Sequence, residues 1–402
     1  MNWFPLISFS QEGCKNRLKT EILYFCAGVP TQGAPHPFMA ADWLVSRGYH
    51  VRVVCRHDAN ATPIRTPFET VSYSPFGGST ANYVRGALAE MLRARSAGKQ
   101  TIFYLHGHNT TPAGCLALLG VDRQRIIYHT QDYIEPGRYP LWEFFEGRMA
   151  RRAGCVISNE PNRARSLASH YRLRQMPMVV PTALPKDWPR PGRDQTLRSA
   201  ILAHIGRQDS DECRLVMHEG GYSPVRCSRQ LVEAFRSLPE DYVLVFTGMA
   251  KGSAARGELD RLVGDLGMDQ RIVVFEQLSF EDLMRHTACC DIGILLYPND
   301  GIGNFYQCPG RLTHYLGCGL PIVASNFPGL ELLTLKHNLG AVCDSESPIA
   351  IVDAIRAVGE KSKGELATDA VRLKQLAKGE LAYETHAWQI EEVVRRIIKS
   401  RE

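Results

Sequence analysis

The stretch CPGRLTHYLGCGLPIVAS, residues 308–325, contains a proline, a short amphipathic run, a Gly-Cys-Gly-Leu-Pro segment and an apolar run. Pro309 suits the first turn of a helix, where its missing N–H has no intrahelical partner to lose. Gly317 and Gly319 are typical of a helix end, because glycine adopts the left-handed conformation of a C-cap without strain. We therefore predict a helix from about Pro309 that stops against a buried strand at residues 321–325.

Apolar runs and helical segments alternate on both sides of this stretch. The second half contains, in order, RLVMH, RQLVEAFRSL, YVLVF, RIVVF, EDLMRH, DIGILLY, RLTHYLG, PIVAS and GAVC. In RQLVEAFRSL the apolar side chains fall at helical spacing and form the buried stripe of a helix; they are Leu231, Val232, Phe235 and Leu238. Short strands that alternate with helices indicate parallel βαβ units and a doubly wound sheet.

The first half repeats this architecture. It contains ILYFCA, VRVVC, ANYVRGALAEMLRAR, TIFYL, RIIYH, GCVIS and MPMVV. The segment at 181–194, PTALPKDWPRPGRD, is rich in proline, which opposes both helix and central strand and marks an interdomain connection. We therefore predict an α/β protein with an N-terminal domain at 1–182, a C-terminal domain at 183–382 and a closing helical segment at 383–402.

Length and composition agree with two globular domains. The chain has 402 residues, of which 44% are hydrophobic and 22% charged. The net charge of +5 is spread along the sequence, so we expect no nucleic-acid binding, whereas a small anionic ligand fits. The twelve cysteines include no Cys-x-x-Cys pair, and no signal peptide is expected, so we predict a cytoplasmic protein with reduced thiols. The apolar start is too short to span a membrane, which leaves at most a peripheral membrane contact.

Several segments of the second half resemble the donor-binding domain of the family-4 retaining glycosyltransferases. They are GGYSPVRCSRQLVEAF, YVLVFTG, RIVVFEQLSFEDL, CCDIGILLYP and PGRLTHYLGCGLPIVAS. The first half is similar in outline to the N-terminal domain of that family. The matching segments there are GVPTQGAPHPFMAADWLVSRGYHVRVVC, IIYHTQDY and AGCVISNEPNRARSLASHYRL.

The resemblance implies the GT-B fold, in which two Rossmann-like domains face each other across a cleft. It also implies that the N-terminal domain binds the acceptor, that the C-terminal domain binds the nucleotide sugar, and that the closing helix crosses back to the N-terminal domain. That helix would present Trp388 and the aliphatic residues after it as an apolar face. The implied reaction moves a sugar from a UDP- or GDP-linked nucleoside diphosphate donor to a hydroxyl of a saccharide, lipid-linked or small-molecule acceptor. The anomeric configuration is retained, and neither a metal nor a cofactor beyond the donor co-substrate is expected.

A pyrophosphate explains why such a site needs helix ends and basic residues. Free N–H groups at a helix N-terminus and nearby cations stabilise its negative charges. The resemblance places Arg226 at the position of a phosphate-binding lysine, and Arg311 lies in the first turn of the predicted helix. Lys251 is a weaker third candidate. As structural alternatives, either arginine could be a solvated surface charge, and the Gly301 and Gly303 loop an ordinary turn.

The resemblance thus implies a set of donor-site residues. The catalytic candidates are His129, Arg226 and Lys251. The candidates for binding the donor are Gly33, Gly221, Phe275, Gly301, Gly303, Asn304, Tyr306, Arg311, Leu312 and His314. The sequence departs from the family at three of these positions. Tyr306 and His314 stand where many members carry two glutamates, and Gly221 stands where an arginine is usual. His314 could hydrogen-bond a ribose hydroxyl or be a satisfied helix residue of the interior.

A second constellation lies in the first half, just past two predicted strands. YLHGH contains His106 and His108, and YHTQD contains His129 and Asp132. These residue types can bind a metal, but most histidines at strand ends do not, and we favour contacts to sugar and acceptor.

The resemblance implies that His129 lies by the donor sugar. It also supplies a set of acceptor contacts, which comprises His36, His106, Asp132 and Glu160. The Asp-x-Asp at 209–211 matches the metal signature of a different glycosyltransferase fold, and we discount it. Two other functions stay open, namely a non-catalytic GT-B scaffold or binding subunit and a sugar-nucleotide epimerase on the same fold.

Overall fold

The computed structural model describes residues 20–28, 35–56, 66–73, 80–96, 100–210 and 212–400. The chain divides into two compact units. Unit 1 comprises Met1–Asp187 and Tyr383–Glu402, and unit 2 comprises Trp188–Ala382. The division falls within the proline-rich segment, a few residues after the expected boundary at 182/183.

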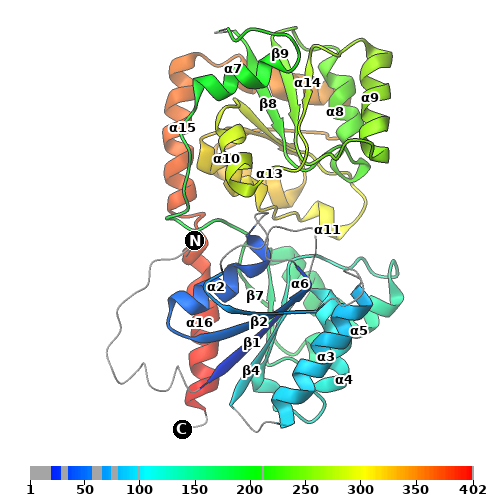
Figure 1. Ribbon diagram of the computed structural model, residues 1–402, viewed down its shortest axis with the longest axis vertical. Coiled ribbons are helices and arrows are strands. Elements are labelled where there is room, and N and C mark those ends of the chain that lie inside the picture. Colours follow the sequence, from blue (N-terminus) through cyan, green and yellow to red (C-terminus); the bar gives the residue numbers. More distant parts are fainter. Residues whose placement is uncertain are drawn as a thin grey trace. The chain divides into compact units, whose positions relative to one another are not determined.

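Unit 1 is built on a parallel sheet whose described strands follow the order β3-β2-β1-β4-β5-β6-β7 (Figure 1). The strands are β1 (Glu21–Cys26), β2 (His50–Arg56), β3 (Glu69–Tyr73), β4 (Thr101–His106), β5 (Ile126–Thr130), β6 (Cys155–Ser158) and β7 (Met178–Val179). In register, Glu21 pairs with His50 on one side and with Thr101 on the other. The order reverses between β1 and β4, and ligands of such sheets bind beyond the carboxyl ends of the strands at that point.

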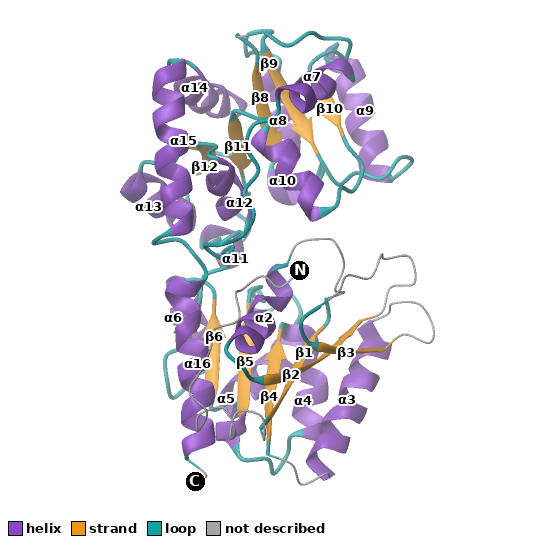
Figure 2. Ribbon diagram, turned by 60° about the vertical axis from the view of Figure 1, so that its left-hand side comes forward, coloured by secondary structure: helices purple, strands orange, loops and turns teal. Residues whose placement is uncertain are grey.

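Helices cover both faces of this sheet (Figure 2). They are α2 (Met39–Ser46), α3 (Thr80–Ser96), α4 (Thr111–Ala117), α5 (Pro140–Arg152), α6 (Pro161–His170) and α16 (Glu384–Lys399), with the 3-10 turns η1 (His36–Phe38), η2 (His108–Thr110) and η3 (Arg123–Arg125). Successive residues of β1 point to opposite apolar clusters. Ile22 and Tyr24 pack with α2 and α16, whereas Leu23 and Phe25 pack with α3, α4 and α5. Burial on both faces explains why the central strands β1 and β4 are nearly continuous apolar runs rather than alternating ones.

The closing helix α16 packs in the core of unit 1, beside α2 (Figure 1). Ile390 and Val394 are fully buried, and Arg47 of α2 forms an ion pair of 2.8 Å with Glu391. The expected apolar face is therefore present, but the assignment of Trp388 to it is wrong. Its side chain is 53% exposed, because at its place on the helix it lies outside the arc that faces α2 and the sheet.

A buried carboxyl group lies between the sheet and α5 of unit 1. The hydroxyl groups of Tyr128 and Tyr171 donate to Glu146 at 2.5 and 2.8 Å. Burial raises the pKa of Glu146 to about 7, although both tyrosine hydrogen bonds lower it. The folded protein thus holds a proton on Glu146 at a pH at which the unfolded chain has released it.

We expect Glu146→Gln to flatten the pH dependence of unfolding. The pKa of Glu146 is higher in the folded protein than in the unfolded chain. Its protonation therefore stabilises the folded state fully below about pH 4.5, and this stabilisation is lost as the pH rises towards about 7. This loss amounts to about 3 kcal/mol for a shift of this size, and glutamine should abolish it. Urea unfolding between pH 4.5 and 8 measures the effect, with Glu392→Gln on the exposed face of α16 as the control. An unchanged slope in Glu146→Gln would contradict the assignment.

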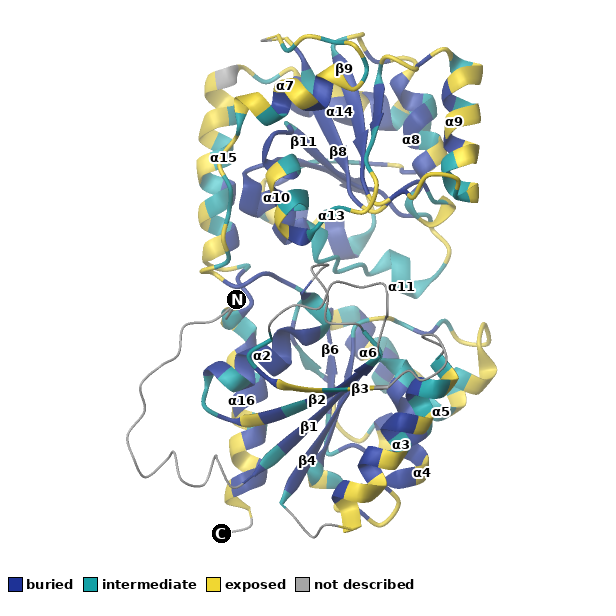
Figure 3. Cartoon of the chain, in the orientation of Figure 1, coloured by how far each residue is buried: buried dark blue, intermediate teal, exposed yellow. Residues whose placement is uncertain are grey.

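Unit 2 contains a second parallel sheet, whose described strands follow the order β10-β9-β8-β11-β12-β13. The strands are β8 (Arg214–His218), β9 (Tyr242–Phe246), β10 (Ile272–Val274), β11 (Ile292–Leu295), β12 (Ile322–Ser325) and β13 (Gly340–Cys343). The central strands of both sheets are buried, as Figure 3 shows. The order reverses between β8 and β11, so the predicted doubly wound architecture is confirmed in both units.

The helices of unit 2 flank this sheet. They are α7 (Gln195–Ala203), α8 (Ser228–Phe235), α9 (Ala254–Leu266), α10 (Phe280–Ala288), α11 (Ile302–Phe305), α12 (Arg311–Cys318), α13 (Pro328–His337), α14 (Pro348–Gly359) and α15 (Lys363–Lys378), with the turn η4 (Pro224–Arg226). The apolar stripe predicted for α8 is confirmed, because Leu231, Val232 and Phe235 are fully buried in the core of unit 2. Among the described residues, no helix combines the length and apolar character needed to cross a bilayer.

Helix α12 begins and ends where the sequence predicts. Its first turn closes when the Leu312 N–H donates to the Pro309 carbonyl at 3.1 Å. Gly319 ends the helix in the left-handed conformation, with φ of +85°. A Cβ atom there would also lie 3.0 Å from the Cβ of Ala370 on α15, so glycine is required both by the backbone and by the packing.

Candidate functional site

The candidate site of unit 2 lies at the carboxyl ends of β8 and β11, where the strand order reverses. The loop after β8 contains Glu219, Gly220 and Gly221, and the last two have φ of +96° and +74°. Positive φ values of this kind strain any other residue. The Gly-Gly pair therefore lets the chain turn sharply beside the start of α12.

Arg226 lies against this turn at the end of η4. A Cβ atom on Gly220 would be only 3.3 Å from the Arg226 Cζ, so the missing side chain makes room for the guanidinium. Burial, and then the positive charge of Arg311, lowers the pKa of Arg226 below its ordinary value. Two cationic side chains are thus held close together.

Arg311 is fixed by contacts in the first turn of α12. Its Nη1 donates to the Glu219 carbonyl at 2.8 Å, and its Nη2 donates to the Tyr297 hydroxyl. The Arg311 Cζ also lies 5.4 Å from the centroid of the Tyr297 ring, within the range of a cation–π contact. Within the described part of the chain, neither Arg311 nor Arg226 forms an ion pair with a carboxylate. The two guanidinium charges are therefore available to an anion.

His314 is buried and contacts the carboxylate of Glu219, a residue that the sequence analysis did not single out. It is 3% exposed, and its Nδ1 lies 2.8 Å from the Oε2 of Glu219. The other carboxylate oxygen accepts a hydrogen bond from Thr287 at 3.2 Å, and the Glu219 N–H donates to the Tyr315 hydroxyl at 3.1 Å. The structure thus gives the Nδ1 of His314 a partner in the interior of unit 2. Glu219 just before the Gly-Gly pair was the signal that could have revealed this.

His218, the last residue of β8, also escaped the sequence analysis. It is completely buried, and its Nδ1 has no hydrogen-bond partner among the described residues. Burial, followed by the charges of Arg311 and Arg226, lowers its pKa well below the ordinary value. His218 is therefore neutral and leaves the positive charge of the site to the two arginines.

The segment that contains the donor-binding candidates Gly301, Gly303, Asn304 and Tyr306 forms the short helix α11. Gly301 precedes it, Gly303 lies within it, and Tyr306 ends it. The Asn304 amide donates to Asp300 at 2.6 Å, and the Tyr306 ring packs edge-on against Phe305 at 5.2 Å. These four candidates share one segment that follows β11.

The remaining donor candidates of unit 2 have different surroundings. The Lys251 side chain is exposed, and the described contacts do not connect it with the two arginines. Leu312 is 5% exposed and packs in the interior of unit 2. The Phe275 ring lies between His204 and His286, at 5.0 and 4.8 Å between ring centroids.

In unit 1, two buried histidines lie at the carboxyl ends of the adjacent strands β4 and β5. The His106 and His129 rings are 4.7 Å apart between centroids. Tyr24 donates its single hydroxyl hydrogen to the Pro37 carbonyl at 2.8 Å, so it accepts from the His106 Nδ1 at 2.7 Å. Burial lowers the pKa of His106 to about 4. Burial and the neighbouring His106 together lower the pKa of His129 well below its ordinary value. Both rings are therefore neutral.

His129 has one ring nitrogen left for a ligand. Its Nδ1 lies 2.8 Å from the Tyr104 hydroxyl, whereas its buried Nε2 has no hydrogen-bond partner among the described residues. A buried polar atom of this kind costs free energy unless a ligand or water satisfies it. His129 at the carboxyl edge is therefore placed to contact a bound molecule.

The other candidates of unit 1 divide into structural and exposed residues. Glu160 caps α6, since its carboxylate accepts the N–H of Arg163 at 2.7 Å, which gives it a structural role. Asp132 is exposed near the end of β5, and His36 lies in η1. Gly33 lies outside the described residues.

The structure also bears on the metal signatures considered from the sequence. Asp209 forms a 3.0 Å ion pair with the buried Arg198, which explains it as a structural residue, while Asp211 lies outside the described part of the chain. Within the described ranges, no group of three or more His, Cys, Asp and Glu side chains is arranged to hold a metal ion.

Comparisons with known proteins match both units. Residues 36–187 match the family described as Glycosyltransferase Family 4, and residues 215–360 match Glycosyl transferases group 1. A curated relative, the D-inositol 3-phosphate glycosyltransferase of Xylanimonas cellulosilytica, is 24% identical over 375 residues, which cover 86% of this chain and 85% of the relative. The chitobiosyldiphosphodolichol beta-mannosyltransferase of Candida albicans is 25% identical over 187 residues, 45% of this chain and 38% of that protein.

Solved structures share the fold at lower identity. The sucrose-phosphate synthase of Thermosynechococcus elongatus superposes with a TM-score of 0.75 at 15% identity, over 95% of this chain and 100% of that one. The Anabaena HepE protein in complex with UDP-glucose superposes with a TM-score of 0.71 at 17% identity, over 94% of this chain and 99% of that one.

Proposed function

This chain belongs to the family-4 glycosyltransferases of the GT-B fold and uses a nucleotide sugar, and we propose that it transfers the sugar to a hydroxyl acceptor with retention of the anomeric configuration. We assign a UDP- or GDP-linked donor to unit 2. We assign a saccharide, a lipid-linked molecule or another small molecule with a free hydroxyl to unit 1 as the acceptor. The observation that carries the proposal is the arginine pair, Arg226 and Arg311, at the carboxyl edge of unit 2.

The arginine pair suits a diphosphate. Holding two like charges close together in a partly buried place is unfavourable, as the lowered pKa of Arg226 indicates. A pyrophosphate brings about two negative charges and matches the planar fork of a guanidinium. Arg311 is already positioned by Glu219 and Tyr297, so little side-chain entropy is lost on binding.

The same two charges would act on the reaction itself. The bond between the anomeric carbon and the diphosphate oxygen breaks, and a bond from that carbon to the acceptor oxygen forms on the same face. The proton of the acceptor hydroxyl passes to the departing diphosphate oxygen. Negative charge grows on the diphosphate in the transition state, where fixed cations contribute most. In this mechanism Arg226 and Arg311 supply the charge compensation, so we propose that no metal or further cofactor takes part.

His129 of unit 1 is our candidate for contact with the transferred sugar. With the neutral ring held at Nδ1 by Tyr104, the free Nε2 can exchange a hydrogen bond with a sugar hydroxyl. Among the other candidates, the segment of Gly301, Gly303 and Tyr306 supports the donor proposal by its position after β11. For Lys251 and Leu312 the described contacts add no support.

A panel of nucleotide sugars tests the donor assignment. We expect a UDP- or GDP-linked sugar to raise the midpoint of thermal unfolding, because ligand at 100 times its Kd adds about 2.7 kcal/mol of stability. ADP- and TDP-linked sugars serve as controls for general anion binding. No shift with any member of the panel would contradict the donor proposal and favour a non-catalytic binding subunit.

The stereochemical course needs a separate measurement. With a donor of α configuration, we expect the first product formed to be the α-glycoside, which proton NMR of the initial product distinguishes from the β form. A β-glycoside would contradict retention without affecting the donor assignment. An isomerised nucleotide sugar in place of a glycoside would indicate an epimerase.

A further inference from the structure

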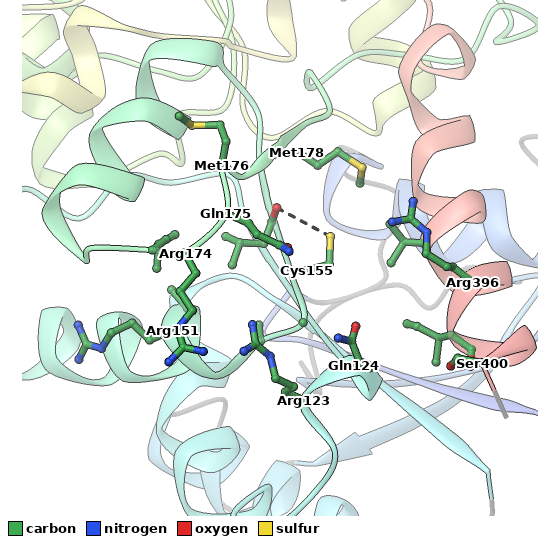
Figure 4. Close-up of a pocket in the computed structure, with 17 residues that line it drawn as sticks. Arg123, Gln124, Arg151, Cys155, Arg174, Gln175, Met176, Met178, Arg396 and Ser400 are labelled. Atoms are coloured by element: carbon green, nitrogen blue, oxygen red, sulfur yellow. Dashed lines mark hydrogen bonds between the residues drawn. The ribbon is translucent and has the colours of Figure 1, made fainter.

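A pocket with a volume of about 550 Å³ lies in unit 1, outside the site described above (Figure 4). It is lined by residues that precede or begin β5, β6 and β7, among them Gln124, Cys155 and Met178, and by the last turns of α16. His106 and His129 end their strands at the carboxyl edge of the same sheet. Because the strands are parallel, the pocket is at the opposite edge from these histidines.

Four arginines from four different elements line this pocket, and no aspartate or glutamate does. They are Arg123 of η3, Arg151 of α5, Arg174 before β7 and Arg396 of α16. Of these four arginines, only Arg396 forms an ion pair within the described part of the chain. Its partner is Glu392 at 3.5 Å, and both side chains are exposed. The Nε of Arg123 is buried without a hydrogen-bond partner among the described residues. The positive charge of the pocket is therefore not balanced by its own lining.

The rest of the wall is apolar. Met176 and Met178 line one side, and Val393 and Ile397 of α16 contribute aliphatic surface. Met176 is 62% exposed, so its side chain is accessible to a ligand. Methionine adapts its shape to irregular apolar ligands. Figure 4 shows Met176 and Met178 along the upper side of the pocket, with Arg123 and Arg151 below.

We propose that this pocket binds a phosphorylated amphiphile, with the phosphoryl group held by the arginines and the apolar part against the methionines. Guanidinium groups match phosphate oxygens in geometry and charge, and the lining contains no carboxylate that competes for Arg123, Arg151 or Arg174. The ligand is either a membrane phospholipid or a free phosphate ester, since both carry the same two features. The site is separate from the proposed transfer reaction and would regulate or locate the enzyme.

Titration calorimetry on the full chain with dihexanoyl phosphatidic acid, kept below its micelle concentration, tests the site. We expect saturable binding that the double variant Arg174→Ala/Arg396→Ala weakens by roughly 100-fold, about tenfold for each charged hydrogen-bonding group. Both side chains are exposed, so the variant should keep its urea midpoint. The matched control is Arg85→Ala/Arg165→Ala, which removes two exposed arginines of unit 1 outside the pocket.

Two further experiments separate the apolar contacts from the phosphoryl contacts and distinguish a membrane lipid from a free phosphate ester. Met178→Ser should weaken dihexanoyl phosphatidic acid but leave the weaker binding of inorganic phosphate unchanged. Co-sedimentation with phosphatidylcholine vesicles that contain phosphatidic acid, but not with phosphatidylcholine alone, would identify a membrane lipid as the source. Binding of the short-chain probe without vesicle binding would identify a free phosphate ester. The proposal is overturned if the probe does not bind saturably, or if the pocket variant and the control bind it equally.

Discussion

Arg226→Ala should lower kcat/KM for the nucleotide-sugar donor by about 10²–10³-fold, the effect of removing one group that stabilises charge in a transition state. The Arg226 guanidinium lies close to the backbone of Gly220, and no carboxylate of the described residues forms an ion pair with it. A charge held in this way has no structural partner to lose. The free energy of unfolding should therefore stay within about 1 kcal/mol of the wild type, or rise as the repulsion with Arg311 is relieved.

Arg226→Lys and Arg229→Ala complete this experiment. Lysine restores the charge without the fork, so we expect it to recover part of the activity. Arg229, three residues further along, is exposed and pairs with Glu233 at 2.9 Å on the surface of α8, so its loss should change kcat/KM less than about threefold. Steady-state kinetics with the donor identified by the panel measures all three variants. Wild-type turnover in Arg226→Ala would remove Arg226 from the mechanism.

Glu219→Ala should destabilise unit 2 by about 3–5 kcal/mol, because it leaves buried polar partners without a hydrogen bond. The carboxylate accepts from Thr287 and bonds His314, and both of these side chains are buried. The Glu219 carbonyl also holds Arg311, so a displaced loop would disturb the donor site in addition. Urea unfolding followed by circular dichroism gives the change in free energy.

A double-mutant cycle isolates the contribution of the pair. We combine Glu219→Gln with His314→Gln and expect the two losses to be non-additive by about 0.5–3 kcal/mol, as for residues in direct contact. Glu258 on α9 provides the control, because it accepts from the Tyr222 hydroxyl at 3.2 Å at a partly exposed place. Strict additivity of the Glu219 and His314 changes would show that their contact has no energetic weight.

The local elements were predictable because their signals are contained in short windows. The end of α12 followed from Gly319, whose left-handed conformation is a property of one residue and its neighbours. The buried side of α8 followed from the spacing of Leu231, Val232 and Phe235. Trp388 shows that an apolar residue type alone is a poor guide, because its side chain lies outside the arc of α16 that buries Ile390 and Val394 and is 53% exposed.

The sites depended on long-range contacts that no window contains. The partner of His314 could not be foreseen, because Glu219, which contributes the carboxylate at its Nδ1, is far away in the sequence. The pocket of unit 1 is lined by arginines from η3, α5, α16 and the segment before β7, and nothing in their separate sequence surroundings indicates that they line one pocket.

The sequence by itself determined the two doubly wound units, the order of their segments and the family, since these rest on local periodicity and on motif order. Only the tertiary structure decided which charged groups pair and which are left for a ligand. The physical reason is that the electrostatic state of a side chain depends on burial and on neighbours within a few ångströms, and the fold, not proximity along the chain, selects those neighbours.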